Sequence, residues 1–298
     1  MAGYSPLRFK RAEMPDLIQI AKAIDFVEDN LCEPIAVADM AQAASYSLYY
    51  FCRTFNQATH HTPYDYLMRR RLSEAARMLF QSDNKIIDVA LDHQFNGPET
   101  FSRAFKRMFA LQPSQWRKLG PAAGRWTMPR LTLAHLQHLQ KGDYLKAVLK
   151  DRPAFQLAGL MARGGDDPAA VGELWALLYR ELVGVAPLAT RGGYRGLFFL
   201  GKGWDRAGSL YLAAVEAHDL DTAGTPLVVK ALPARTWARF IHKGARQDLP
   251  LTLDYVFHTW LPKSGRALGA SCVLERYGSH PSDIEDAESE TEIWIPLA

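Results

Sequence analysis

A pattern of five residues occurs twice in this chain, and the two copies lie 50 residues apart. Each copy has phenylalanine, arginine and phenylalanine at alternate positions, then a proline eight residues on and an aromatic residue three further. The copies are Phe51, Arg53, Phe55, Pro63 and Tyr66, and Phe101, Arg103, Phe105, Pro113 and Trp116. Upstream, residues 39–41 and 88–90 also correspond, with an offset of 49. Fixed-period similarity indicates duplicated architecture, here a helical unit with one extra residue before its second helix.

Length and composition bound the class of protein. At 298 residues the chain is long enough for about two domains. No apolar run approaches the roughly 20 residues that a bilayer span needs, and the N-terminus lacks the apolar segment of a secretory signal. Cys32, Cys52 and Cys272 have no metal-ligand spacing, so we expect a cytoplasmic protein with no metal and no cofactor.

Charge is distributed unevenly along the chain. Between Ser45 and Lys118 there are eleven Lys/Arg residues and six Asp/Glu residues, whereas Glu275 to Glu292 carries seven acids and one arginine. A basic N-terminal half followed by an acidic end favours a nucleic-acid-binding module joined to a second domain.

Hydrophobic periodicity and capping residues predict a helical N-terminal half. Short helix, tight turn and longer helix occur twice in succession, which is the helix-turn-helix arrangement whose second helix enters a major groove. The predicted helices cover residues 16–30, 37–44, 47–59, 63–80, 85–93 and 98–109.

The repeated phenylalanines and arginines have different predicted roles. Each phenylalanine pair is spaced i, i+4 and therefore lies on one helix face, which we expect to be core. Arg53 and Arg103 are rotated away from that face, where a groove-reading side chain must project. Arginine suits guanine or a phosphate, although a solvated arginine is the alternative for either copy.

Three consecutive arginines, Arg69 to Arg71, lie on the helix that joins the two units. At least one of the three must point inward or bind an acid, because a helix turns its side chains through 100° per residue. As a rigid strut, this helix would set the separation of the recognition helices at about one DNA turn, roughly 34 Å.

Residues 17–118 resemble the AraC/XylS family of bacterial transcription regulators, and Rob-like members in particular. The resemblance is carried by Ile87–Leu91, by Phe95–Phe109 and by Pro113–Arg117. Gln94 and Ala110 stand where the family usually has glycine, so the turns there are expected to differ slightly.

The resemblance implies which residues contact double-stranded promoter DNA. Relatives carry tryptophan and glutamine in place of Tyr49 and Cys52, so a different target is expected. Glu99 either accepts a hydrogen bond from cytosine or stabilises its helix N-terminus, and the second interpretation is favoured. The predicted DNA-binding residues are Tyr49, Cys52, Arg53, Glu99, Thr100, Arg103, Lys106 and Arg107.

The C-terminal half is predicted to be α+β and also duplicated. Each round is strand, helix, strand, strand: 155–161, a helix from Pro168, 194–200 and 209–217, then 236–241, a helix over 249–260, 272–277 and 291–296. The predicted organisation is an N-terminal extension (1–15), a double helix-turn-helix domain (16–119), a linker with a helical segment over 131–149 (120–152), and an α+β domain (153–298).

This layout, together with residues 273–277 and 290–296, resembles the GyrI-like effector-binding domain. Members hold a small molecule between the two repeats, against aromatic side chains and a buried acid. Glu275 matches the family acid and Glu292 is the competing one; without a protein cation beside it, a buried Glu275 would select cations. The predicted ligand-binding residues are Glu275, Tyr277, Trp175, Tyr179, Tyr255 and Trp294.

The function predicted from these features is a bacterial, nucleoid-associated transcription regulator and activator that binds an asymmetric site and contacts RNA polymerase. Its C-terminal domain would sense a small aromatic or cationic ligand, or bind a protein. The alternative is a GyrI-like hydrolase fused to a DNA-binding domain, in which Glu275 is a general base beside Tyr277 or Tyr179. We expect no catalytic residues.

Overall fold

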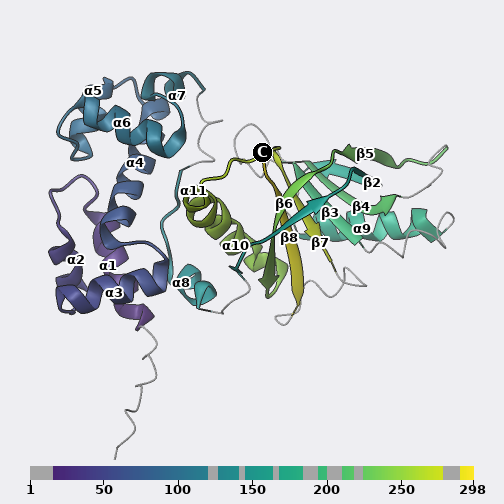
Figure 1. Ribbon diagram of the computed structural model, residues 1–298, viewed down its shortest axis with the longest axis horizontal. Helices are drawn as coiled ribbons and strands as arrows, with labels where there is room; N and C mark the ends of the chain where they lie inside the picture. The colour runs from purple at the N-terminus through teal and green to yellow at the C-terminus, as the bar shows by residue number, and fades with distance from the viewer. Residues whose placement is uncertain are drawn as a thin grey trace, which may run out of the picture.

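The computed structural model describes residues 16–119, 127–140, 145–163, 168–183, 194–199, 210–217, 224–277 and 289–298. An N-terminal helical half lies beside a C-terminal half built on one large sheet (Figure 1). Across the described segments, no helix combines the length and apolar character needed to cross a membrane.

The helical half contains the two predicted helix-turn-helix units, and its first six helices end within two residues of their predicted bounds. A seventh helix, α7, was not predicted as a separate element. The helices are α1 (Leu17–Asp29), α2 (Val37–Ala43), α3 (Leu48–Thr59), α4 (Pro63–Gln81), α5 (Ile86–Asp92), α6 (Pro98–Phe109) and α7 (Pro113–Leu119).

Each unit has its own core, and the repeated aromatic residues form its centre. Phe51 and Phe55 are fully buried, and Phe55 meets Tyr66 edge-on with ring centroids 5.7 Å apart. In the second unit Phe105 meets Trp116 in the same way at 5.5 Å. Helix α4 contributes buried residues to both cores, so it is the rigid connection that the sequence predicts. Its length is about 28 Å at 1.5 Å per residue.

Left-handed residues close the equivalent turns of the two units. Ser45 and Gln94 have φ of 57° and 63°, and His60 and Ala110 both have φ of 59°. These pairs are separated by the same offsets of 49 and 50 as the sequence repeat. The expectation that Gln94 and Ala110 would alter the turns is therefore wrong. Both residues take the left-handed conformation, which glycine adopts more readily than any other residue.

Replacing Ala110 with glycine should raise the free energy of unfolding by about 0.5–1 kcal/mol, because Ala110 carries a Cβ in a left-handed conformation. Urea denaturation of the full chain measures this change. The matched substitution Ala104→Gly, in the middle of α6, should instead destabilise by a similar amount. A destabilised Ala110→Gly variant would contradict the assignment of strain to this turn.

The three consecutive arginines of α4 all have protein partners. Arg69 donates its Nε to Asp65 at 2.9 Å. Arg70 forms a buried ion pair with Glu28 on α1, with Nη2–Oε2 at 2.7 Å. Arg71 donates its Nε to the Leu31 carbonyl at 2.9 Å. Arg70 and Arg71 therefore point inward. Arg70 anchors α4 to α1, and Arg71 anchors α4 to the loop that follows α1.

The segment after the second unit differs from its prediction. Instead of one helix over 131–149, the chain forms a short helix α8 (Leu133–Leu139) and then strand β1 (Val148–Arg152). Met128, Leu131 and Leu136 are buried in the core of the first helix-turn-helix unit. This segment therefore packs on the helical half, although the sequence leaves its role open.

The described strands of the C-terminal half form one antiparallel sheet in the order β1-β6-β8-β7-β3-β4-β2-β5. The order is symmetric about the central pair β7 and β3, so each predicted strand-helix-strand-strand round forms one side of the sheet. Besides β1, the strands are β2 (Phe155–Arg163), β3 (Tyr194–Phe199), β4 (Leu210–Ala217), β5 (Val228–Leu232), β6 (Arg235–Lys243), β7 (Cys272–Arg276) and β8 (Glu290–Pro296).

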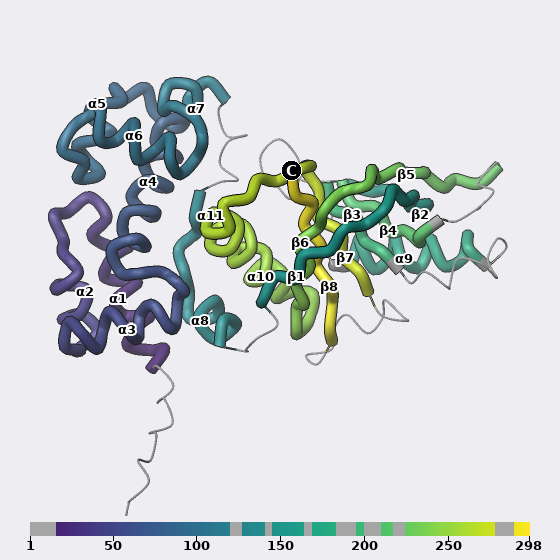
Figure 2. The backbone as a smooth tube through the Cα atoms, viewed as in Figure 1, coloured from purple at the N-terminus to yellow at the C-terminus, as the bar shows by residue number. Residues whose placement is uncertain are grey.

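The two outermost strands, neither of which was predicted, are exchanged between the rounds (Figure 2). Strand β1 precedes β2 in the chain but is hydrogen-bonded to β6 of the second round. Strand β5 precedes β6 but is hydrogen-bonded to β2 of the first round. Each round is therefore completed by a strand that belongs in sequence to the other.

Both long helical segments of this half pack on the same side of the sheet and share one core with it. They are α9 (Pro168–Val183) and the continuous segment α10 (Leu249–Tyr255), η6 (Val256–Trp260) and α11 (Leu261–Ser264), which follows the short 3₁₀ helix η5 (Arg246–Asp248). The predicted helix over 249–260 is present, with a π-helical turn at η6. The core of the opposite face comes from strands and contains Trp294.

Candidate DNA-binding surface and effector site

Helix α3 presents polar and aromatic side chains on the face opposite its buried phenylalanines. Tyr49 is 81% exposed, and Arg53 is also exposed. Cys52, between them in sequence, is half-buried. Arg53 has no ion pair within the described residues, so its guanidinium is available for an external partner.

Helix α6 repeats this arrangement with different residues. Glu99, Thr100, Arg103 and Lys106 are exposed. Glu99 lies in the first turn, where Gly97 provides no side-chain cap, so its charge is favourably placed against the helix dipole. These positions agree with the predicted DNA-binding surface, but their contacts with bases stay predictions.

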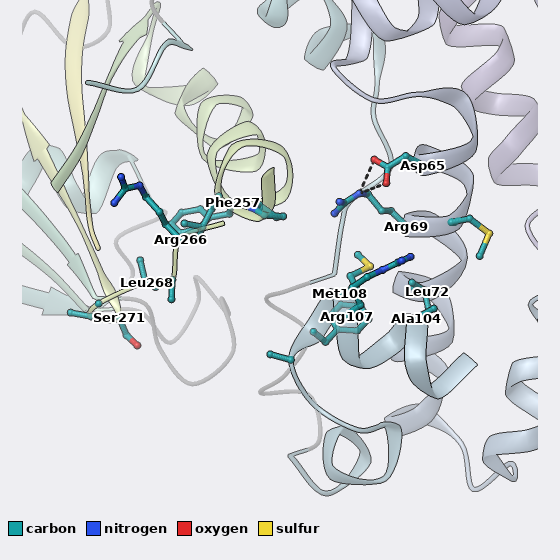
Figure 3. A pocket seen from close by; sticks show the side chains of 18 residues that line it. Asp65, Arg69, Leu72, Ala104, Arg107, Met108, Phe257, Arg266, Leu268 and Ser271 are labelled. Atoms are coloured by element: carbon teal, nitrogen blue, oxygen red, sulfur yellow. Dashed lines mark hydrogen bonds and ion pairs between the residues drawn. The ribbon is translucent and has the colours of Figure 1, made fainter. Parts of the chain in front are cut away.

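Arg107 is exposed and lies one helical turn after Arg103 on the same side of α6. It lines a cleft between the helical half and the C-terminal half, together with Ala104 and Met108 (Figure 3). Arg107 therefore borders both the predicted DNA-binding face of α6 and the cleft.

In the C-terminal half, a buried carboxylate lies near the junction of the two rounds. Glu275 on β7 is 2% exposed. Its Oε2 accepts hydrogen bonds from the Tyr277 hydroxyl and, at 3.3 Å, from the Tyr211 hydroxyl. Glu292, the competing acid, is half-buried and pairs with Arg239 and Arg276. Of the two acids considered from the sequence, Glu275 is thus the buried one.

A protein cation, Arg246, lies beside Glu275. Cation selectivity was predicted for a buried Glu275 that has no such neighbour, so that condition is not met. Arg246 on η5 places its Nη2 3.8 Å from Glu275 Oε2, and its guanidinium lies 5.2 Å from the centre of the Tyr211 ring. Arg246 and Tyr211 were both missed by sequence reasoning. Tyr211 alternates with Ala213 and Val215 on its strand, which could have placed it on the helix-covered face; Arg246 follows a strand end and carries no such signal.

Gly196 on β3 makes room for this cluster of Glu275, Tyr277, Tyr211 and Arg246. It is the register partner of Glu275, and a Cβ at this position would lie 2.2 Å from the Tyr211 hydroxyl and 2.9 Å from Glu275 Oε2. The glycine therefore lets the Tyr211 ring cross the neighbouring strand and reach the carboxylate.

Burial keeps both tyrosines protonated, so they act as hydrogen-bond donors. It raises the pKa of Tyr277 and of Tyr211 above the usual value, and the neighbouring Glu275 carboxylate raises both further.

Only part of the predicted aromatic wall surrounds Glu275. Trp175 on α9 meets Tyr277 edge-on with centroids 5.6 Å apart, and Tyr179 lies one turn beyond it, 6.5 Å from Trp175. Trp294 lies on the opposite face of the sheet and donates its Nε1 to Glu292 at 3.0 Å. Tyr255 meets His60 of the helical half edge-on at 5.5 Å. The grouping of Trp294 and Tyr255 with Glu275 is therefore wrong.

The helical segment α10-η6-α11 joins the two halves through hydrogen bonds, two of them buried. His61 Nε2 lies 2.9 Å from Thr259 Oγ1 on η6. Lys263 on α11 donates to the carbonyl of His60, the C-cap residue of α3. The hydroxyl of Thr252 on α10 lies 2.7 Å from His138 of α8 and 2.8 Å from His242 of β6.

The hydrogen at His61 can be assigned from its neighbours. Burial alone would raise the pKa of Asp65, but the hydrogen bond from His61 and the charge of Arg69 lower it to about 2. An ionised Asp65 only accepts, so His61 Nδ1 donates to it at 2.8 Å. Burial lowers the pKa of His61, so the ring is neutral at pH 7 and its Nε2 accepts from the Thr259 hydroxyl.

Each half of the chain matches a known protein family. Residues 40–119 match the family described as a helix-turn-helix domain, and residues 147–298 match the GyrI-like small molecule binding domain. The chain is 36% identical over 98 residues to the uncharacterized HTH-type transcriptional regulator YbfP of Bacillus subtilis, covering 33% of each chain.

Two further relatives come from Escherichia coli (strain K12). Identity to the right origin-binding protein is 36% over 93 residues, covering 31% of this chain and 32% of that one. Identity to the regulatory protein SoxS is 35% over 98 residues, covering 33% of this chain and 92% of SoxS. The matched region is thus about a third of the length of YbfP and of the right origin-binding protein, but nearly all of SoxS.

Proposed function

The chain belongs to the AraC/XylS family of DNA-binding transcription regulators and carries a GyrI-like small-molecule-binding domain, and on this premise we propose that it activates transcription from an asymmetric promoter site under the control of an aromatic effector. The observation that carries this proposal is the presence of two unlike recognition helices in one chain.

The two helices differ where specificity is decided. Their shared arginines lie at equivalent exposed positions, while Tyr49 and Cys52 on α3 correspond to Glu99 and Ser102 on α6 at an offset of 50. Two recognition helices with the same base-facing residues would favour a repeated half-site, because each would select the same bases. Two different recognition helices, α3 and α6, joined by the single helix α4, favour two different half-sites in a defined order.

Effector binding is proposed for the helix-covered face around Glu275. Trp175, Tyr179 and Tyr277 supply aromatic surface, and the paired Glu275 and Arg246 supply polar contacts. The Arg246 guanidinium lies beside the Glu275 carboxylate and over the face of the Tyr211 ring. A cationic aromatic ligand would use the same two contacts. Such a ligand would take over the place of the Arg246 guanidinium.

Replacing Arg246 with methionine should raise the affinity for benzyltrimethylammonium about tenfold, because Glu275 then lacks its nearest cation and the ligand can supply one. Tryptophan fluorescence titration of the full chain measures the affinity. Neopentylbenzene, the neutral isostere, should bind the variant and the parent chain alike, and Arg180→Met on the exposed side of α9 should change neither. Equal changes for the charged and neutral ligands would contradict a role for the Glu275 charge.

Activation is tested by transcription in vitro. With RNA polymerase and a promoter selected by the full chain, we expect the transcript yield to rise on adding the protein. A fall in yield would overturn the assignment as an activator while leaving DNA binding intact.

The hydrolase alternative is not favoured by the arrangement at Glu275. A general base needs a carboxylate oxygen free to bind water, and one of the two oxygens of Glu275, Oε2, already accepts from two tyrosine hydroxyls and faces Arg246. Release of product from a bound ester over repeated turnovers would revive the alternative.

A further inference from the structure

The cleft lined by Arg107 is separate from the Glu275 cluster and lies between the two halves of the described chain. Its volume is about 840 Å³, within the range of small-molecule sites. One wall comes from α4 and α6, and the other from η6, α11 and residues 266–271 (Figure 3).

The charges that line this cleft are predominantly positive. Arg69, Arg107 and Arg266 line it, against a single carboxylate, Asp65, which gives an excess of two positive charges (three minus one). Asp65 is already engaged by Arg69 and by His61. A cationic ligand would therefore find no available carboxylate, whereas an anion would find unmatched positive charge.

The arginines also retain hydrogen-bond donors. Only the Nε of Arg69 is donated to Asp65, and its terminal amino groups have no partner in the part of the chain that the structure describes. The guanidinium of Arg107, from the same wall, has no acidic partner there either. Arginine forks of this kind match the paired oxygens of a carboxylate, sulfonate or phosphate.

Apolar side chains line the rest of the cleft on both walls. Met68, Leu72 and Met108 lie on the helical half, and Phe257, Leu261 and Leu268 lie on the C-terminal half. A nucleic-acid backbone offers phosphates but no apolar surface for the second wall. A small molecule with an anionic head and an apolar body satisfies both walls at once.

We infer that this cleft binds a small amphipathic anion, with its head on Arg69 and Arg107 and its apolar body against Phe257, Leu261 and Leu268. Bound there, the ligand would hold the second recognition helix α6 to the C-terminal half. This site differs from the effector site proposed above in position and in the sign of the ligand charge.

The test uses two fluorescent probes that share one ring system. 8-Anilinonaphthalene-1-sulfonate carries the anionic head, and N-phenyl-1-naphthylamine lacks it. We expect the full chain to bind the sulfonate saturably and at least tenfold more tightly than the neutral amine. The double variant Arg69→Met/Arg107→Met should lose at least tenfold in sulfonate affinity and change its affinity for the amine less than twofold.

Two further variants locate the site. Leu268→Asp, which adds a carboxylate to the opposite wall, should also weaken the sulfonate, while Arg180→Met on α9 should not. Glu275→Gln should leave sulfonate binding unchanged, since Glu275 lies outside the cleft lining. Thermal denaturation checks that each variant is folded. Binding that is not saturable, that ignores the arginine and Leu268 substitutions, or that is lost in Glu275→Gln would overturn the inference, whatever the outcome for DNA or for cationic effectors.

Discussion

Replacing Arg70 with methionine should lower the free energy of unfolding of the helical half by about 3–5 kcal/mol. Arg70 donates to both carboxylate oxygens of Glu28, at 2.8 and 2.7 Å, and to the Met128 carbonyl. The side chains of Arg70 and Glu28 are only 11% and 8% exposed. Methionine keeps the length of the side chain but leaves Glu28 charged and held mainly by the Tyr66 hydroxyl at 2.8 Å, and this unpaired charge causes the loss.

Two variants separate this effect from a general loss of surface charge. Arg77→Met breaks an exposed ion pair with Glu74 on the same helix and should cost no more than about 1 kcal/mol. The double variant Glu28→Leu/Arg70→Met should be more stable than Arg70→Met alone, because no charge is then left buried. Urea denaturation followed by far-UV circular dichroism gives the free energies. Equal costs for Arg70→Met and Arg77→Met would contradict the assignment of Arg70 as an anchor of α4.

Replacing Arg53 or Arg103 with alanine should each reduce the free energy of binding to a selected promoter duplex by about 1–3 kcal/mol. Both side chains are exposed at equivalent positions of α3 and α6 and project away from the buried phenylalanines. Their sites are far apart on separate units, so the losses should add in the double variant. Fluorescence anisotropy at physiological salt measures the affinity.

The same series distinguishes base recognition from phosphate binding. An arginine that reads a base should lose discrimination at one position of the duplex, whereas one that binds only a phosphate should lower the salt dependence by about one unit of slope. Arg180→Ala, on the exposed side of α9, is the matched control and should leave the affinity unchanged. Unchanged affinity in both single variants and in the double variant would show that the DNA-binding surface lies elsewhere.

The sequence predicted the helical half well because its signals are local. The i, i+4 phenylalanines, the prolines at the starts of α4 and α6, and the repeat itself all act within one or two helical turns. The same signals placed Arg53 and Arg103 on exposed faces. The left-handed turns at Gln94 and Ala110 were mispredicted because both residues adopt a conformation that their residue type disfavours, as Ser45 and His60 do in the first unit.

The C-terminal half was predicted less completely because its organisation is set by long-range pairing. Strands β1 and β5 lie next to β2 and β6 in sequence but pair with the opposite round, and no local pattern encodes that exchange. Glu275 was identified because it matches the acid of the GyrI-like family, but Arg246 reaches it from a different element. Trp294 and Tyr255 were misplaced because aromatic character does not reveal which face of a sheet or helix a residue occupies.

A chain with two different recognition helices should bind an asymmetric DNA site by itself. Native mass spectrometry of the full chain with a selected duplex gives the stoichiometry of the complex, and hydroxyl-radical footprinting of the same complex gives its extent. We predict one chain per duplex, protecting two unlike half-sites about one helical turn apart. Two chains on a palindromic duplex, each protecting the same half-site, would contradict the claim.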